Sequence, residues 1–186
     1  MDPLVEVFTA HDAPLLALPF FGGGDPGPIT ATMAHVPELL EPIMGFLGPI
    51  LSPSAVDWRT KEIVIVRTSA LLSCRYCIDS HTTVALDAGL TNDEVHSLRG
   101  ETSIESGFTD PRDLALLAWI DAVAGGRGGV SDQTSAATRE AFTQAEIVEL
   151  TILIGATMLL NRYATSMRLP TSDTVSSRLI TEGFSI

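Results

Sequence analysis

The stretch that decides the fold runs from Glu62 to His81 and reads EIVIVRTSALLSCRYCIDSH. It contains both cysteines of the 186-residue chain, Cys74 and Cys77, with the histidine four residues after the second and the glutamate twelve residues before the first. We expect Ser73 to cap a helix that begins here, its hydroxyl accepting from a free backbone N–H of the first turn. Cysteines at i and i+3, and a histidine at i+4 from the second, then share one helical face.

This spacing is typical of a redox-active dithiol. Residues three apart on a helix have Cβ atoms about 5–6 Å apart, so a small adjustment allows a disulfide. The N-terminal end of the helix dipole favours a thiolate, and His81 one turn later can accept or return the proton. Two alternatives stay open: buried thiols that only fill the core, and a zinc site in which His96 or Glu62 completes the set of Cys74, Cys77 and His81. The motif itself supplies only three ligands, so we expect no metal.

Glu62 reaches this site only if the chain turns. Twelve residues of unbroken helix would place it about 18 Å along the axis from Cys74. We therefore predict a break near residues 72–73, after which the cysteine helix packs back against the helix that carries Glu62. A buried carboxylate near His81 and a thiol can act as a general base, directly or through one water.

Helical signals occur on both sides of this stretch. Apolar residues recur at helical spacing over 37–51, and Asp57 is a good N-cap for the following helix. The β-branched run 63–66 favours a strand by propensity, but no partner strand is apparent, so we predict a helix. Gly89 is placed to end the cysteine helix.

Four further helices are predicted after Gly89. Thr91 and Glu94 form a capping box that opens a helix through residue 98. Asp110 followed by a proline starts the helix predicted over 111–124, which the glycine-rich run 125–129 ends. A polar helix is predicted over 132–142, and Thr143 opens the longest, most apolar helix, which stops before the proline at position 170. Residues 100–109 are expected to form a loop, and the fold class is all-α.

Composition limits the partners. The chain has 11 Lys and Arg against 23 Asp and Glu, a net charge of −12, and no basic run. Nucleic-acid binding and an anionic membrane surface are therefore not expected. With 45% hydrophobic and only 18% charged residues, the helices are expected to leave apolar faces that a homo-oligomer covers, as a dimer, trimer or hexamer.

The N-terminal sequence lacks the pattern of a signal peptide, and the apolar stretch 150–160 is too short to span a bilayer, so we expect a cytoplasmic protein. Residues 1–34 show no periodic pattern, and the run PFFGGGDPGP at 19–28 indicates a loop. We divide the chain into an irregular N-terminal arm, 1–34, and one helical domain, 35–186.

The pattern E-x11-C-x2-C-x3-H, met by Glu62, Cys74, Cys77 and His81, resembles the alkylhydroperoxidase D-like branch of the carboxymuconolactone decarboxylase family. The order of helices is also similar over roughly residues 35–168. In one respect the chain departs from this pattern: Tyr76 stands between the cysteines where the best-known peroxidase of the family has a second histidine.

The resemblance implies the alkylhydroperoxidase D-like helical fold and a thiol-disulfide oxidoreductase that reduces hydroperoxides. It implies that Cys77 is the peroxidatic thiol, Cys74 the resolving thiol, and His81 and Glu62 a proton relay, with Tyr76 lining the site. The helix-dipole argument by itself favours Cys74 as the more reactive thiol. The expected partners are a peroxide or other small substrate and an external dithiol reductant; no bound cofactor is expected. The alternatives are a decarboxylase-like enzyme acting on a small carboxylate and a redox sensor without turnover.

Overall fold

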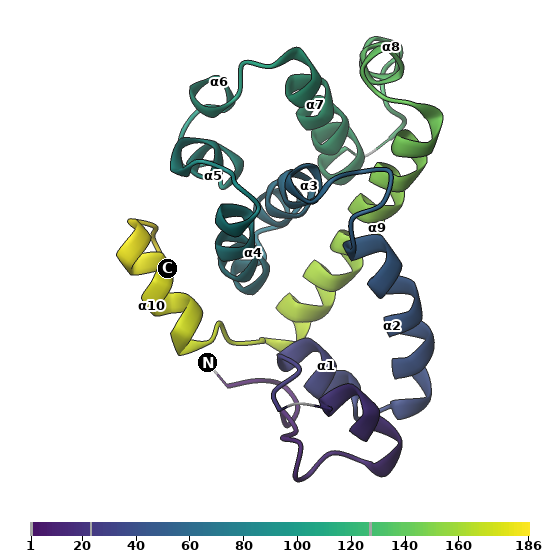
Figure 1. The fold of residues 1–186 in the computed structure, drawn as a ribbon, viewed down its shortest axis with the longest axis vertical. Coiled ribbons are helices and arrows are strands. Elements are labelled where there is room, and N and C mark those ends of the chain that lie inside the picture. The colour runs from purple at the N-terminus through teal and green to yellow at the C-terminus, as the bar shows by residue number, and fades with distance from the viewer. Residues whose placement is uncertain (1, 23, 127) are drawn as a thin grey trace.

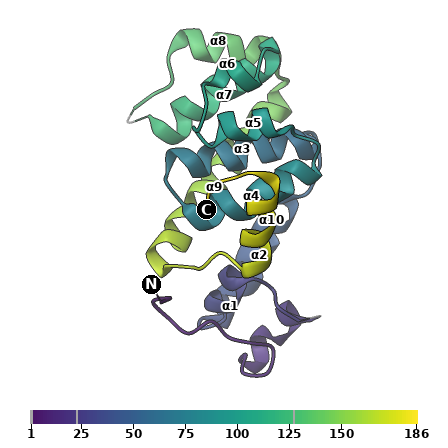
Figure 2. The same ribbon diagram turned by 90° about the vertical axis from the view of Figure 1, so that its left-hand side faces the viewer.

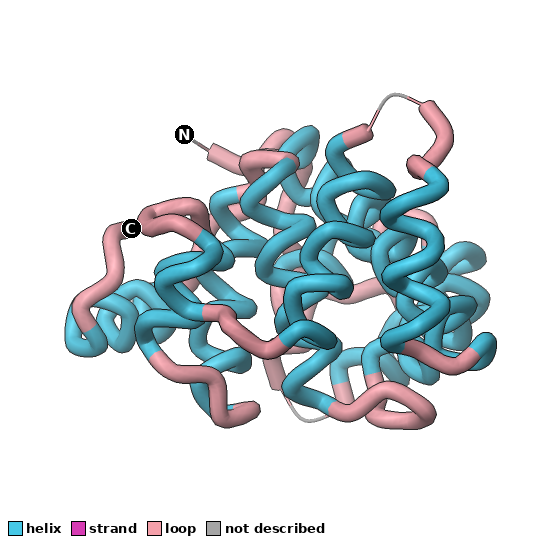
Figure 3. The backbone as a smooth tube through the Cα atoms, turned by 90° about the horizontal axis from the view of Figure 1, so that it is seen from above, coloured by secondary structure: helices cyan, strands magenta, loops and turns pink. Residues whose placement is uncertain are grey.

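The chain is helical throughout the part that the structure describes. The computed structural model describes residues 2–22, 24–126 and 128–186, and no strand occurs among them, which confirms the all-α class (Figure 3). The helices, in chain order, are the 3₁₀ helix η1 (Leu15–Phe21) and the α-helices α1 (Pro28–Met33), α2 (Pro37–Leu51), α3 (Trp58–Leu71), α4 (Arg75–Asp87), α5 (Asn92–Leu98), α6 (Ile104–Gly107), α7 (Pro111–Gly125), α8 (Asp132–Ala141), α9 (Gln144–Met167) and α10 (Asp173–Glu182).

Helix α3 lies at the centre, with α4, α7 and α9 packed around it (Figure 1). Four consecutive residues, Ile63 to Val66, are at most 3% exposed, so this helix is buried on nearly every side. This burial places the run in the core of the molecule and explains why β-branched residues adopt helical structure here. The prediction of a helix over 63–66 is confirmed.

Most helix starts follow the predicted capping chemistry. The Asp57 carboxylate accepts from the Thr60 N–H, and the Asp110 carboxylate accepts from the first turn of α7. Both predicted capping boxes, at Thr91 and Thr143, are formed. The run 125–129 includes Arg127, which lies outside the described residues, and α7 ends at Gly125.

The prediction that Ser73 caps the cysteine helix is wrong. Ser73 has a left-handed backbone, with φ of 55°, and Cys74 is the N-cap residue of α4 without a side-chain capping bond. The left-handed residue reverses the chain, while the Cys74 N–H donates to the Ser69 carbonyl at 3.0 Å. The predicted break at 72–73 is thus present, and Ser73 forms the turn rather than the cap.

The N-terminal segment is more ordered than predicted. It contains η1 and α1, and Pro19–Phe21 and Pro28, expected in a loop, belong to these helices. Gly23 of the predicted loop lies outside the described residues. The Tyr163 hydroxyl donates to Thr32 Oγ1 at 3.0 Å, which joins α9 to α1. Residues 1–34 are therefore not irregular throughout, while the domain boundary at 34/35 stays a prediction.

Helix α9 runs beside α3 from one end of the molecule towards the other, and α10 follows it on the side of α4 (Figures 1 and 2). Helix α9 has 24 residues, and among the described helices it alone is long and apolar enough to span a bilayer by length and composition. The prediction that the apolar stretch 150–160 is too short to do so considered only part of this helix. The length and composition of α9 are weak evidence for a membrane span, because a core helix meets the same test. Leu150, Leu153 and Ile154 of α9 are fully buried in the main core.

The outer side of α9 is apolar and open to solvent. Val148, Ile152 and Leu159 are 58%, 43% and 52% exposed, and Leu39 and Phe46 of α2 are exposed beside this helix. Exposed apolar side chains at helical spacing agree with the idea of a face covered in an assembly. Homo-oligomerisation remains a prediction.

Candidate active site

The two cysteines form a disulfide at the start of α4. Cys74 and Cys77 are bonded to each other, with Cα atoms 5.4 Å apart and with 1% and 5% of the residue exposed. They pack against Ala164 of α9 and against Leu169, which follows this helix. The i, i+3 spacing on a helix therefore brings the thiols within bonding distance, as the sequence predicts. His96, one candidate to complete a zinc set, instead pairs with Glu101 on the far side of α5.

Glu62 and His81 meet across α3 and α4. Because the chain reverses at Ser73, the two helices pack side by side, and His81 Nδ1 lies 2.9 Å from Glu62 Oε2. The glutamate is 3% exposed, while the histidine side chain is 30% exposed. With the carboxylate ionised, Nδ1 donates, and Nε2 is left as the proton acceptor. The predicted return of Glu62 to the cysteine helix is confirmed.

A small cavity of about 60 Å³ adjoins both Cys77 and His81. Its apolar wall comes from Ile29 of α1, Leu51, Ile65 and Leu160, and its polar lining from Ser69, Tyr76, Ser80, Thr157 and Asn161. Tyr76 lies in the lining, as expected from its place between the cysteines. The N-terminal segment contributes through Ile29, so the arm covers one side of this cavity.

Tyr76 is held as a neutral phenol. Burial raises the pKa of its hydroxyl, and the negative charge of Asp25 in the N-terminal segment adds to the rise. A neutral phenol can donate a hydrogen bond, and near neutral pH it loses its proton far less readily than an imidazolium does.

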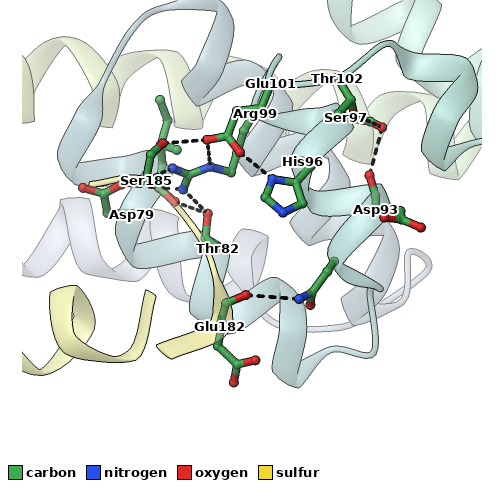
Figure 4. A network of polar contacts seen from close by, with 12 residues as sticks. Asp79, Thr82, Asp93, His96, Ser97, Arg99, Glu101, Thr102, Glu182 and Ser185 are labelled. Atoms are coloured by element: carbon green, nitrogen blue, oxygen red, sulfur yellow. Dashed lines mark hydrogen bonds and ion pairs between the residues drawn. The ribbon is translucent and has the colours of Figure 1, made fainter. Parts of the chain in front are cut away.

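A second polar cluster, which the sequence analysis missed, surrounds Arg99 and includes Asp79 and Thr82 of α4 (Figure 4). Arg99 of α5 is 1% exposed in its side chain; it donates to Thr82 Oγ1 at 2.9 Å, to Glu101 at 2.7 Å and to the carbonyl of Ser185 at 2.5 Å. Its Nη1 lies 3.6 Å from the buried carboxylate of Asp79. This cluster fixes α4 to α5 and to the C-terminal residues.

The pKa values of two carboxyl groups in the cluster shift in opposite directions. Burial raises the pKa of Asp79, against the lowering effect of Arg75, Thr171 and Arg99. Burial alone would also raise the pKa of Glu101, but hydrogen bonds from Arg99 and His96 outweigh it and lower that pKa. Burial therefore outweighs the cationic neighbours at Asp79, whereas hydrogen bonds outweigh burial at Glu101.

Lys61 is a second buried cation that the sequence analysis did not single out. It is 0% exposed, and its Nζ lies 2.6 Å from Glu149 Oε1 and 2.7 Å from the carbonyl of Ile50. Burial would raise the pKa of Glu149, but the bonds from Lys61 and Ser54 prevail and lower it. Two consecutive residues of α3 therefore contact different parts of the molecule: Lys61 joins α2 to α9, and Glu62 faces the site.

Residues 37–121, which contain all four residues of the motif, match the model of the carboxymuconolactone decarboxylase family. Over these residues the chain resembles the carboxymuconolactone decarboxylase family. The curated relative YdfG of Bacillus subtilis (strain 168), an uncharacterized protein, is 27% identical over 117 residues, which is 61% of this chain and 77% of the relative.

Two solved structures show the family's alkylhydroperoxidase D-like fold. One is a protein of unknown function from Agrobacterium tumefaciens, described as a candidate antioxidant defence protein AhpD; it is 27% identical with a TM-score of 0.70, over 76% of this chain and 95% of that one. The other is the alkylhydroperoxidase AhpD core of an uncharacterized peroxidase-related protein from Ralstonia eutropha JMP134. It is 18% identical with a TM-score of 0.80, over 93% and 94% of the two chains.

Proposed function

We propose that the protein is a thiol-dependent peroxidase that reduces a hydroperoxide through the pair Cys74 and Cys77. The observation that carries this proposal is the cavity shared by Cys77 and His81, with Glu62 hydrogen-bonded behind the histidine. A thiol, a base and an orienting carboxylate in this order are the parts of an activated nucleophile. The family match and the fold relatives support the same assignment.

The first half-reaction takes place at Cys77. Its thiol proton passes to His81, and the thiolate sulfur attacks the terminal oxygen of the hydroperoxide. The O–O bond breaks, the sulfur keeps the hydroxyl as a sulfenic acid, and the alkoxide takes the proton from the imidazolium to leave as an alcohol. Glu62 stabilises the imidazolium between these two transfers.

The second half-reaction restores the thiols. The Cys74 thiolate attacks the sulfenic sulfur, the S–O bond breaks, and hydroxide takes up a proton to leave as water. The resulting disulfide is the state that the structure records. An external dithiol then reduces it by thiol-disulfide exchange and becomes a disulfide itself.

The test is peroxide-dependent oxidation of a dithiol, with dithiothreitol as the probe. We expect turnover by the parent protein and none by Cys77→Ser. In Cys74→Ser, peroxide should leave a sulfenic acid on Cys77 that a dimedone-type reagent traps. A label found only in Cys77→Ser would reverse the roles of the two cysteines. Reversible oxidation without turnover would exclude the peroxidase and favour the redox sensor.

A further inference from the structure

The polar side of the cavity has hydrogen-bonding groups that the protein itself leaves unused. Ser69 Oγ, Thr157 Oγ1 and Asn161 Oδ1 are buried, and none has a hydrogen-bond partner within the described ranges 2–22, 24–126 and 128–186. The three residues are 0%, 5% and 1% exposed, and all three line the cavity beside Cys77 and His81. A buried oxygen without a partner destabilises a fold, so three around one cavity require an explanation.

Asn161 defines the chemistry of the missing partner. Its Nδ2 donates to the backbone carbonyl of Thr157 at 2.7 Å, which fixes the amide so that Oδ1 is a pure acceptor. The partner of Oδ1 must therefore be a donor. The hydroxyls of Ser69 and Thr157 can each donate or accept, so they can bind an oxygen that carries lone pairs.

The cavity also limits the size of its occupant. A single water needs at least about 10–15 Å³ of such space, so about 60 Å³ admits a group of a few heavy atoms. Ile29, Leu51, Ile65 and Leu160 form apolar walls that suit a short alkyl chain but not a bulky one.

From this geometry we infer that Ser69, Thr157 and Asn161 bind the hydroperoxide group of a compact substrate, hydrogen peroxide or a small alkyl hydroperoxide, and orient it towards Cys77. The inference rests on the proposed function. The substrate O–H donates to Asn161 Oδ1, and the two hydroxyls donate to the peroxide oxygens. In this proposal the three buried oxygens gain their hydrogen-bond partners only when the substrate is bound.

The test uses variants that remove one side-chain oxygen: Thr157→Val replaces the hydroxyl by a methyl group, and Ser69→Ala deletes it. Thr157→Val and Ser69→Ala should keep or raise the melting temperature, because each removes a buried oxygen that has no partner in the free protein. The same variants should lower the second-order rate constant for oxidation of the reduced thiols by hydrogen peroxide about tenfold, the change that corresponds to about 1.4 kcal/mol. Alkylation of the thiols by iodoacetamide should be unaffected.

Thr68→Val is the matched control. Thr68 Oγ1 is equally buried and also has no partner in the part of the chain that the structure describes, but Thr68 does not line the cavity. This variant should keep or raise the melting temperature and react with hydrogen peroxide at the parent rate. Equal loss of rate in the control would show a general effect of repacking and overturn the inference.

The outcomes separate this inference from the proposed function. A parent protein that does not turn over peroxide would refute the proposed function. If the parent turns over peroxide and Thr157→Val and Ser69→Ala are oxidised by hydrogen peroxide at the parent rate, the proposed peroxidase stands and the binding site is refuted. That result is expected if the cavity holds only water. Cumene hydroperoxide tests the limit on substrate size. It should react more slowly than hydrogen peroxide, and Ile29→Ala should raise its rate of reaction.

Discussion

Replacing Arg99 by Met tests the buried network that holds the cysteine helix in place (Figure 4). Breaking a buried ion pair from one side costs about 3–5 kcal/mol, because the charge left behind is uncompensated. The carboxylate of Asp79, which is 2% exposed, still has Arg75 at 3.6 Å in this variant. Methionine also preserves the apolar packing of the Arg99 stem. We therefore expect a loss of stability at the lower end of this range, about 3 kcal/mol. For a chain of this length this is a fall of roughly 6–12 °C in melting temperature.

The assay is thermal and urea unfolding of the parent and three variants. Arg112→Met is the matched control: Arg112 is also paired with a glutamate, at 2.6 Å, but it is 51% exposed, and its loss should cost less than about 1 kcal/mol. Adding Asp79→Asn to Arg99→Met should recover part of the stability, since it removes the uncompensated charge. If Arg99→Met were no less stable than Arg112→Met, or if the double variant regained nothing, the account of this network would be refuted.

Three further outcomes are expected. Glu62→Gln should slow thiol alkylation near neutral pH about tenfold or more while the fold stays intact, because a hydrogen bond to a charged group contributes about 1.5–3 kcal/mol; a variant that alkylates as fast as the parent would remove Glu62 from the mechanism. Glu149→Gln should lower stability by about 3 kcal/mol near neutral pH by leaving Lys61 uncompensated. Because the folded-state pKa of Glu149 lies below its ordinary value of 4.5, its contribution is present above that pH and is lost as the pH falls through the folded pKa, so melting curves of variant and parent should converge in acid. Gly107→Ala should destabilise by about 1–3 kcal/mol, because its Cβ would lie 2.8 Å from backbone atoms of α5, whereas Gly155→Ala on the open side of α9 should stabilise by about 0.5–1 kcal/mol; equal unfolding midpoints would contradict this contrast.

Sequence reasoning predicted the local elements well because their signals are local. Caps at Asp57 and Thr143 act within four residues, and the motif from Glu62 to His81 lies within two adjacent helices. Helix α10 was missed although Ser172 caps it and Gly183, with φ of 89°, ends it; both signals were readable in the sequence.

The missed residues depend on contacts between distant parts of the chain. Asn161 joins the cavity from α9, 84 positions after Cys77, and nothing in its own neighbourhood indicates a site. Arg99 contacts Ser185 and Asp79, which are distant from it in the sequence. Serine is a common N-cap residue, but the reversal between α3 and α4 requires a left-handed backbone at Ser73.

The disulfide between Cys74 and Cys77 closes a loop of very few residues. In the chain-entropy relation, closing a four-residue loop restricts the unfolded chain by only about 2 kcal/mol, whereas a loop of 100 residues restricts it by about 4.7 kcal/mol. In this relation oxidation adds no more than about 2 kcal/mol to the free energy of unfolding, and reduction removes no more than that. We therefore expect the bond to form and break without global unfolding between the two redox states.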